Sequence, residues 1–223
     1  MIKIEKTDVF GWEAAIRGMR NPMNSWDKSD SFWKVDDIQD CVDLYVNDCA
    51  MVVGANDLKL MKNLSKAGSD HGKFLRMINV TVDITAPLYW WKEHDTYKIG
   101  TIANSCSTMH KIQAKEFTLD DFSHEHLDML STDAMVQHII PILNINRNLF
   151  VNNKNKQYWW QMIQLLPSSY NQKRTVQMNY QVLKAMYFAR RHHKLDEWHE
   201  FCAWCETLPY FKEICIQEGD SND

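Results

Sequence analysis

The sequence lacks an apolar run of the roughly 20 residues that a membrane-spanning helix needs. The segment from Met1 to Lys6 also lacks the apolar stretch of a secretory signal peptide. We therefore expect a cytoplasmic protein with no membrane partner. An excess of basic residues is missing too, because the formal net charge is -4 at pH 7. Without an overall positive field, we expect no nucleic-acid partner.

Proline and glycine are scarce, with 5 and 7 copies among 223 residues, and there is no internal repeat or low-complexity linker. A chain of this length can bury a substantial core. We therefore predict one domain that covers residues 1–223. Residues 23–50 are rich in Asp, Trp and Cys and show no clear periodicity, so we interpret them as a variable, irregular insertion.

A disulfide framework and a zinc motif are also missing. The six cysteines are scattered, and Cys202 and Cys205 form a single CxxC pair with no second pair. Such a pair fits helix packing better than redox or zinc chemistry. The histidines around Glu125 and those from His192 to His199 have no zinc-site spacing. We predict no bound metal.

Hydrophobic periodicity predicts the elements of the first half of the chain. They are an edge strand at Ile2 and Ile4, a helix from Trp12 to Met19, a helix from Asp57 to Gly68 that Asp57 caps, a strand from Phe74 to Ile84, and a short aromatic helix, Leu88 to Glu93, after Pro87. Val80, Val82 and Ile84 alternate with polar residues, which predicts a sheet with one wetter face.

The second half is predicted to be mostly helical, with helices at 133–152, 156–166, 179–192 and 195–206 and a strand at Thr175–Met178. The fold class is therefore α+β with one modest sheet. Apolar residues at helical spacing predict a large aromatic core, made of Trp159, Trp160, Met162, Leu165, Met186, Phe188, Trp198, Phe201 and Trp204.

One segment, Lys92 to His110, is dense in charged, amide and hydroxyl groups directly after the aromatic helix. If these groups are buried they need partners, and a polar ligand would supply them. The alternative is a solvated loop with local turn hydrogen bonds. A second alternative is a Cys106 nucleophile with His110 as its base, although no orienting carboxylate can be named.

A second polar segment follows Leu166-Pro167. Asn179, Leu183 and Arg190 lie close to one face of the predicted helix, because offsets of four and seven residues keep side chains in register. An arginine there can present its planar fork to a carboxylate, a phosphate or a uracil carbonyl. A surface salt bridge is the alternative for Arg190.

Together the two segments resemble the flavin-dependent thymidylate synthases. The first segment follows the family's Pro-led aromatic helix, with Thr96-Tyr97-Lys98 in place of Arg-His-Arg and Asn104 to His110 in place of Asn-Glu-x-Ser-x-Arg-Tyr. The second segment matches the family spacing at Leu166-Pro167, Thr175, Asn179, Leu183 and Arg190. Asp70-His71 stands where the family has a Glu-His pair that meets the flavin.

The resemblance implies a fold with a small antiparallel sheet and several helices, assembled as a homotetramer. It also implies FAD as the cofactor and the reductive methylation of a uracil deoxynucleotide, dUMP to dTMP or a related pyrimidine modification. Methylenetetrahydrofolate would supply the carbon, and NADPH would be a further small-molecule partner. In such enzymes the flavin carries the reactive chemistry, and the protein binds and orients.

The resemblance also assigns roles to individual residues. The cofactor-binding residues would be His71, Lys98, Asn104 and Asn179. The substrate-binding residues would be Glu93, Ser105, Ser107 and Arg190, of which Ser107 and Arg190 would also be catalytic.

Several motif positions differ from the family pattern. Ser105 replaces the motif glutamate, Met109 replaces the last motif arginine, and Gln181 replaces the arginine of Asn-x-Arg. A non-catalytic protein that binds a nucleotide or a flavin on the same scaffold is therefore the alternative to an enzyme.

Overall fold

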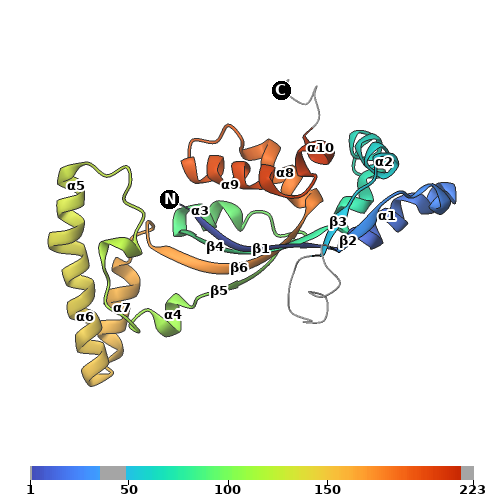
Figure 1. Cartoon of the computed structure of the whole chain (residues 1–223). Coiled ribbons are helices and arrows are strands. Elements are labelled where there is room, and N and C mark those ends of the chain that lie inside the picture. The colour runs from blue at the N-terminus through green and yellow to red at the C-terminus, as the bar shows by residue number, and fades with distance from the viewer. Residues whose placement is uncertain (1, 36–48, 217–223) are drawn as a thin grey trace. The chain divides into compact units, whose positions relative to one another are not determined.

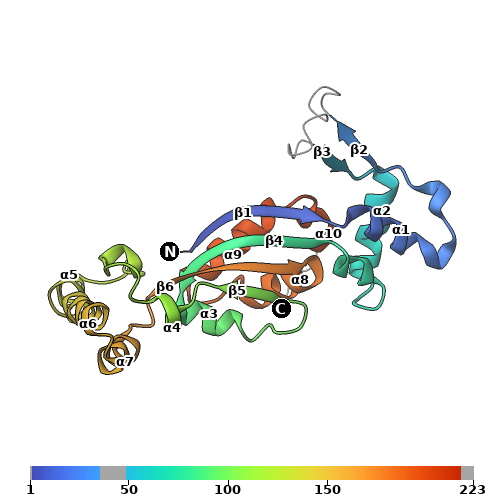
Figure 2. The same cartoon turned by 90° about the horizontal axis from the view of Figure 1, so that it is seen from below.

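A computed structural model of the chain describes residues 2–35 and 49–216. The chain forms two compact units, of which the first comprises residues 1–7, 81–177 and 192–201 and the second comprises residues 8–80, 178–191 and 202–223. The four-stranded sheet has the order β1-β4-β6-β5, and these strands run side by side in both views (Figures 1 and 2). The fold class is α+β with a small antiparallel sheet and several helices, as predicted.

The strands of this sheet are β1 (Lys3–Phe10), β4 (Asn79–Pro87), β5 (Ile102–Ser105) and β6 (Asn171–Asn179). Of these strands, β1 and β6 are longer than the sequence patterns indicated. The edge position of β1 is confirmed, and the alternation of buried and half-buried residues along β4 confirms a sheet with one wetter face. The predicted strand start at Phe74 is wrong, because Gly72–Arg76 forms the 3-10 helix η4, and an apolar run this short does not distinguish the two structures.

The first unit contains the predicted aromatic helix and two of the four helices predicted for the second half of the chain, together with shorter helical elements that were not predicted. They are α3 (Leu88–His94), α4 (Thr108–Lys111), the 3-10 turn η5 (Leu119–Asp121), α5 (Met129–Ala134), the π-helix η6 (Met135–Ile139), α6 (Ile140–Asn153) and α7 (Lys156–Leu165). α5, η6 and α6 form one continuous helix, and α7 packs against α6 as a helical hairpin (Figure 1). α9 (Asp196–Thr207) contributes residues to both units.

Two aromatic clusters hold the first unit together. One packs α6 and α7 on Phe117, Phe122 and Leu143. The other joins α3 to the start of α9, where Trp90 lies 4.8 Å from Trp198 between ring centroids. Burial of such large apolar side chains is the main stabilising term in these clusters.

The second unit consists of α1 (Trp12–Arg20), the 3-10 turns η1 (Asn21–Met23) and η2 (Trp26–Lys28), the hairpin β2 (Phe32–Val35) and β3 (Cys49–Val52), α2 (Ala55–Lys66), η4, α8 (Tyr180–Arg190) and α10 (Phe211–Cys215). The expected lack of regular structure at 23–50 is wrong at Phe32–Val35 and at the start of β3, because β2 pairs with β3 in antiparallel register. Aromatic and β-branched residues in Phe32–Val35 favour this strand. The interpretation of residues 23–50 as a variable insertion stays a prediction. Residues 36–48 of the predicted insertion lie outside the described residues.

Asp57 does not cap a helix, contrary to the prediction. α2 begins after Gly54, so Asp57 lies inside its first turn, where its side chain is fully buried against Arg20. The predicted end of this helix is confirmed, because Gly68 follows the C-terminus with a φ of +102°.

The predicted aromatic core is only partly confirmed. Met162, Met186, Trp198 and Phe201 are buried, whereas Trp159, Phe188 and Trp204 are half-buried and Trp160 and Leu165 are exposed. The residues also divide between the two units. Helical spacing identifies an apolar stripe, but it does not show whether a partner covers every residue of it.

Candidate functional site

The polar segment after α3 contains strand β5, which sequence patterns missed. β5 is an edge strand, and all four of its residues are exposed. It pairs antiparallel with β6, so that Asn104 lies opposite Thr175 and Ser105 lies opposite Arg174. Two predicted site residues, Asn104 and Ser105, therefore lie on an accessible sheet edge.

Of the two alternatives for this segment, the structure shows the exposed one over most of its length. Lys98 is exposed in the turn before β5, Glu93 is half-buried, and only His94 is buried between α3 and the surrounding aromatic rings. Burial lowers the pKa of His94 to about 4, so this side chain is neutral near pH 7. The polar groups of the segment are available to a ligand from solvent.

Ser107 lies two residues after the end of β5 and is the N-cap of α4. Its Oγ accepts a hydrogen bond from the backbone N–H of His110 at 3.0 Å and lies 2.9 Å from Nδ1 of the same residue. Cys106 lies before α4 rather than within it, and its backbone N–H donates to the carbonyl of Lys173. The helical offset that would have brought Cys106 to His110 is not formed, and the histidine contacts Ser107 instead.

A buried polar network supports the β5 edge from the neighbouring strand. Gln172 is buried, and its Nε2 donates to the carbonyl of Cys106 at 2.7 Å. Its Oε1 accepts from Nε of Arg174 at 3.0 Å, and Arg174 also binds Asp95 at 2.7 Å. The network therefore holds the turn before Ser107 and the end of α3 to the same strand.

Arg174 is also stacked, with its guanidinium carbon 4.2 Å from the centre of the Trp91 ring. The Trp91 indole N–H in turn donates to the carbonyl of Gln172 at 2.8 Å. Arg174 was not identified from the sequence, although a signal was present. It lies two positions from Gln172 and two from Val176 in the alternating pattern of β6, so the three side chains lie on the same, inward face of the strand. An arginine at an inward strand position requires partners.

The opposite, wetter face of the sheet carries a polar group of three residues, of which two are charged. Asp83 on β4 accepts a hydrogen bond from Thr175 at 2.6 Å and pairs with Lys173 at 2.9 Å. These two hydrogen bonds lower the pKa of Asp83 below its ordinary value. The carboxylate is therefore ionised across the physiological range.

A pocket of ≈ 500 Å³ lies beside this face. Its lining includes Thr85, Cys106, Ser107, Lys111, Lys115, Asp121, Tyr170 and Lys173. Lys115 pairs with Asp121 and Lys173 pairs with Asp83, whereas Lys111 has no ion pair within the described residues. The pocket offers hydroxyl donors and cationic groups, and Ser107 is the predicted site residue that lines it.

The other predicted site residues belong to the second unit. His71 is exposed directly before η4, which packs against α8, and Arg190 is the half-buried last residue of α8. Asn179 is the N-cap of α8, since its Oδ1 accepts from the backbone N–H of Val182 at 3.0 Å. A Cβ on Gly72 would lie 3.7 Å from Oε1 of Gln181, so this loop approaches α8 closely.

The CxxC pair is part of the packing. Cys202 and Cys205 are buried free cysteines, and burial raises the pKa of the Cys202 thiol to about 11. A thiol with such a pKa is protonated at neutral pH and is a poor nucleophile. Across residues 2–35 and 49–216, no group of three or more His, Cys, Asp or Glu side chains has the geometry to hold a metal ion.

Among the described residues, no helix combines the length and the apolar character that crossing a bilayer requires.

Two solved structures share the fold of the whole chain. Thymidylate synthase X (ThyX) from Helicobacter pylori, crystallised with FAD and dUMP, matches with a TM-score of 0.65 at 14% sequence identity, over 97% of this chain and 98% of the ThyX chain. A second structure of the same enzyme with FAD and dUMP matches with a TM-score of 0.63 at 14% identity, over 96% and 98% of the two chains. No protein-family model and no curated protein matches the sequence. The chain therefore has the fold of the flavin-dependent thymidylate synthases.

Proposed function

We propose that this protein is a cytoplasmic flavin-dependent thymidylate synthase-like enzyme, which binds FAD and reductively methylates dUMP or a related uracil deoxynucleotide. The observation that carries the proposal is the end-to-end fold match to an enzyme crystallised with both ligands. A fold alone does not define an activity, so the polar groups of this chain must support it as well.

The sheet edge supports nucleotide binding. Ser105 and Ser107 present exposed hydroxyl groups at the end of β5. Glu93 lies near the start of the same polar segment, before β5. In this proposal the hydroxyl groups orient the nucleotide, and Arg190 donates two parallel hydrogen bonds to it. The Gln172–Arg174 network keeps the Ser107 turn in place before the ligand arrives, which reduces the ordering that binding requires.

The residues assigned to FAD fit a cofactor rich in hydrogen-bond acceptors. His71, Lys98 and Asn104 are exposed, and Asn179 keeps both amide N–H groups after its oxygen has capped α8. These groups would hold the phosphates and ring carbonyls of FAD. When bound, reduced flavin would supply the reducing equivalents, with methylenetetrahydrofolate as the carbon donor and NADPH as the reductant.

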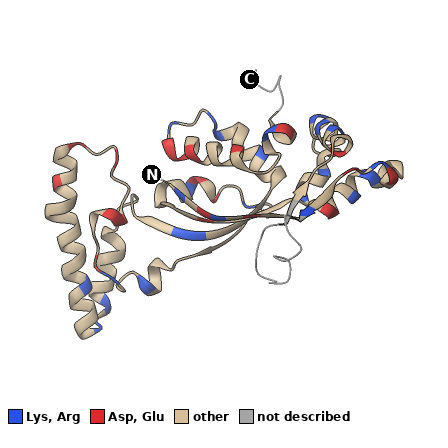
Figure 3. Cartoon of the chain, in the orientation of Figure 1, with Lys and Arg blue, Asp and Glu red and all other residues tan. Residues whose placement is uncertain are grey.

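Exposed apolar surface supports a homotetramer. Ile99 is 92% exposed and Ile102 is 65% exposed beside the free edge of β5. Figure 3 shows few charged residues along α6, and Met129 and Leu130 at the start of α5 are also exposed. Open sheet edges are templates for pairing with another chain, and burial of exposed apolar side chains favours association. We expect light scattering to report a tetramer, and a monomer at micromolar concentration would contradict this part of the proposal.

The activity can be tested directly with reduced FAD, methylenetetrahydrofolate and dUMP under anaerobic conditions. We expect mass spectrometry of the nucleotide pool to show conversion of dUMP to dTMP. If FAD and dUMP bind but no methylated nucleotide forms, the protein is the non-catalytic binding protein instead. The presence of Met109 and Gln181 at positions where the family carries arginine favours that second candidate.

Substitution of Arg190 is the most specific test of the proposed nucleotide binding. Removing a charge-assisted contact costs about 1.5 to 3 kcal/mol, so Arg190→Ala should weaken dUMP binding roughly ten- to more than a hundredfold. Arg190→Lys should restore little, since lysine lacks the planar fork. Lys194→Ala, at an exposed position, is the matched control. Equal dUMP affinity of wild type and Arg190→Ala in calorimetry would reassign this arginine to a surface salt bridge.

A further inference from the structure

A separate pocket lies in the second unit, between α1 and the start of the β2–β3 hairpin. It has a volume of ≈ 330 Å³, and its lining includes Ile16, Arg17, Trp26, Phe32, Trp33 and Met51. This volume falls within the roughly 300 to 1,000 Å³ typical of small-molecule sites. None of these residues is assigned to the flavin or the uracil nucleotide, and of the ligands considered below only the folate rests on the proposed function.

Three aromatic rings form the walls of this pocket and remain half-exposed. Trp26 is 51% exposed, Phe32 is 57% exposed and Trp33 is 45% exposed. Both indole groups are fixed by hydrogen bonds, from Trp26 to the side chain of Asn21 and from Trp33 to the carboxylate of Glu13. Several large rings held open to solvent in one hollow are typical of a surface that stacks against a planar ligand.

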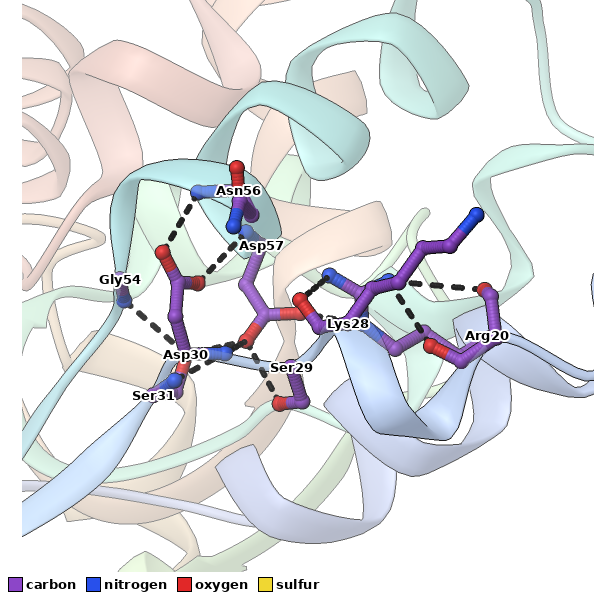
Figure 4. Close-up of polar contacts among 9 residues, drawn as sticks. Arg20, Lys28, Ser29, Asp30, Ser31, Gly54, Asn56 and Asp57 are labelled. Carbon is purple, nitrogen blue, oxygen red and sulfur yellow. Dashed lines mark hydrogen bonds and ion pairs between the residues drawn. The ribbon is translucent and has the colours of Figure 1, made fainter.

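The floor behind these rings is a buried ion pair (Figure 4). Arg20 donates from Nε to Asp57 at 2.6 Å and from Nη2 to the carbonyl of Lys28 at 2.9 Å. Asp57 also accepts from the hydroxyl groups of Ser29 and Ser31, each at 2.7 Å. Burial opposes ionisation, but these hydrogen bonds lower the pKa of Asp57 below its ordinary value.

The same chain segment is tied to α2 from the other side. Asp30 accepts from the backbone N–H groups of Asn56 and Asp57 at 2.9 and 3.1 Å. A Cβ on Gly54 would lie 2.3 Å from Oδ1 of Asp30, so only glycine allows this approach. Because residues 29–31 lead directly into Phe32 and Trp33, the clamp fixes the position of these rings, and the pocket is preorganised.

The charges that line the pocket are complementary to an ionised heterocycle. Arg17 is exposed and has no ion pair within residues 2–35 and 49–216, whereas the guanidinium of Arg20 is occupied by the clamp. Glu13 uses one carboxylate oxygen for Trp33 and keeps the other free to accept. One cationic donor and one anionic acceptor therefore lie beside the aromatic walls.

We propose that this pocket binds a planar amino-substituted heteroaromatic ring that carries an anionic group, as a purine nucleotide does. The ring stacks on Trp26 and Phe32, Glu13 accepts a hydrogen bond from the exocyclic amino group, and Arg17 binds the anionic group. A pterin with an attached carboxylate, as in a folate, shares this chemistry and is the second source of such a ligand.

Isothermal titration calorimetry on the full-length protein, with AMP, GMP and folic acid in separate titrations, tests the proposal. We expect binding of at least one of these probes, and the probe that binds identifies the nucleotide or the folate as the source. If none of the three binds at about 1 mM, which corresponds to roughly -4 kcal/mol, the proposal is overturned.

Substitutions in the pocket lining test whether the probe binds in this pocket. Arg17→Ala and Trp26→Ala should each weaken the affinity for the probe roughly tenfold or more, because one removes a charge-assisted contact and the other a stacking surface. Arg76→Ala and Trp160→Ala remove an exposed arginine and an exposed tryptophan outside the pocket lining and should leave it unchanged. Unchanged circular dichroism confirms that each variant is folded. If the pocket variants bind as wild type does, or if the controls weaken binding equally, the ligand lies elsewhere and the assignment fails.

Discussion

Two arginine–aspartate pairs show how this chain uses the same chemistry for different purposes. In the second unit, the Arg20 and Asp57 side chains are 4% and 0% exposed, and every oxygen of the carboxylate is occupied. In the first unit, Arg174 and Asp95 are 14% and 52% exposed. The first pair is a buried clamp for the chain, and the second is an accessible support beside the candidate site.

The difference decides what each pair contributes. A buried ion pair leaves an uncompensated charge when one partner is removed, whereas water replaces the lost partner of an exposed pair. Burial thus makes the Arg20–Asp57 pair structural. The Arg174–Asp95 pair is partly exposed, so its contribution to folding is correspondingly smaller.

The largest expected effect is the loss of folding stability when the buried Arg20–Asp57 pair is broken. Asp57→Ala should lower the free energy of unfolding by about 3 to 5 kcal/mol, because Arg20 and the two serine hydroxyl groups lose their acceptor. Asp95→Ala, the matched change in the exposed pair, should lower it by about 1 kcal/mol or less. Urea denaturation measures both values. Equal losses in the two variants would show that exposure does not separate the pairs.

The second expected effect is a loss of folding stability at low pH, which should begin at a higher pH for buried His94 in the first unit than for buried Asp57 in the second. The pKa of His94 falls from 6.5 to about 4 on folding, so the unfolded chain binds the proton more strongly between these values. Stability is therefore complete above about pH 6.5 and decreases as the pH falls toward 4, by about 3 kcal/mol in all. The pKa of Asp57 is lowered from 3.8, so its contribution is lost only at still lower pH.

Denaturation midpoints from pH 7 to pH 4 test this order. His94→Gln should remove the decrease between pH 6.5 and 4, because glutamine does not ionise. The decrease should persist in Asp95→Ala, where the histidine is intact. A wild-type stability that stays constant down to pH 4 would contradict the neutral state assigned to His94.

The third effect concerns Arg174 itself. Arg174→Ala removes the stack on Trp91 and the hydrogen bonds to Gln172 and Asp95, so we expect a loss of about 1 to 2 kcal/mol of stability. Arg174→Lys should recover the ion pair but not the stack. Chemical denaturation of both variants gives the two values. A loss of unfolding free energy as large as that of Asp57→Ala would show that Arg174 stabilises the fold as strongly as the buried pair does.

The smallest effect separates capping from cofactor binding at Asn179. Asn179→Ala removes the N-cap of α8 and should cost about 1 kcal/mol. Asn179→Asp keeps an oxygen that can accept from Val182 but lacks the amide N–H groups assigned to FAD. We expect the aspartate variant to retain thermal stability and to release FAD more readily in dialysis. If it retains FAD as wild type does, Asn179 acts only as a cap.

Much of the fold follows from local sequence patterns. The helices at 133–152, 156–166, 179–192 and 195–206 were predicted within a few residues because each is long and periodic. β5 was missed because a short, fully exposed strand has no hydrophobic alternation. The position of Asp57 was wrong because its partner Arg20 lies 37 residues away, and no local pattern encodes such a pair.

The candidate site was predictable to a smaller extent. The polar segment and Ser107, which lines the larger pocket, were identified from the sequence, but residue types alone left open whether the segment is buried or exposed. Arg174, whose partners come from α3 and from its own strand, was not identified. The capping role of Asn179 could have been predicted, since an asparagine directly before a helix is a common N-cap.

The most direct test of the central claim is the visible absorbance spectrum of the purified protein after incubation with FAD and removal of free cofactor. We expect a retained flavin spectrum that changes further when dUMP is added. A colourless protein that retains no FAD would contradict the assignment of a flavin enzyme, whatever its affinity for nucleotides.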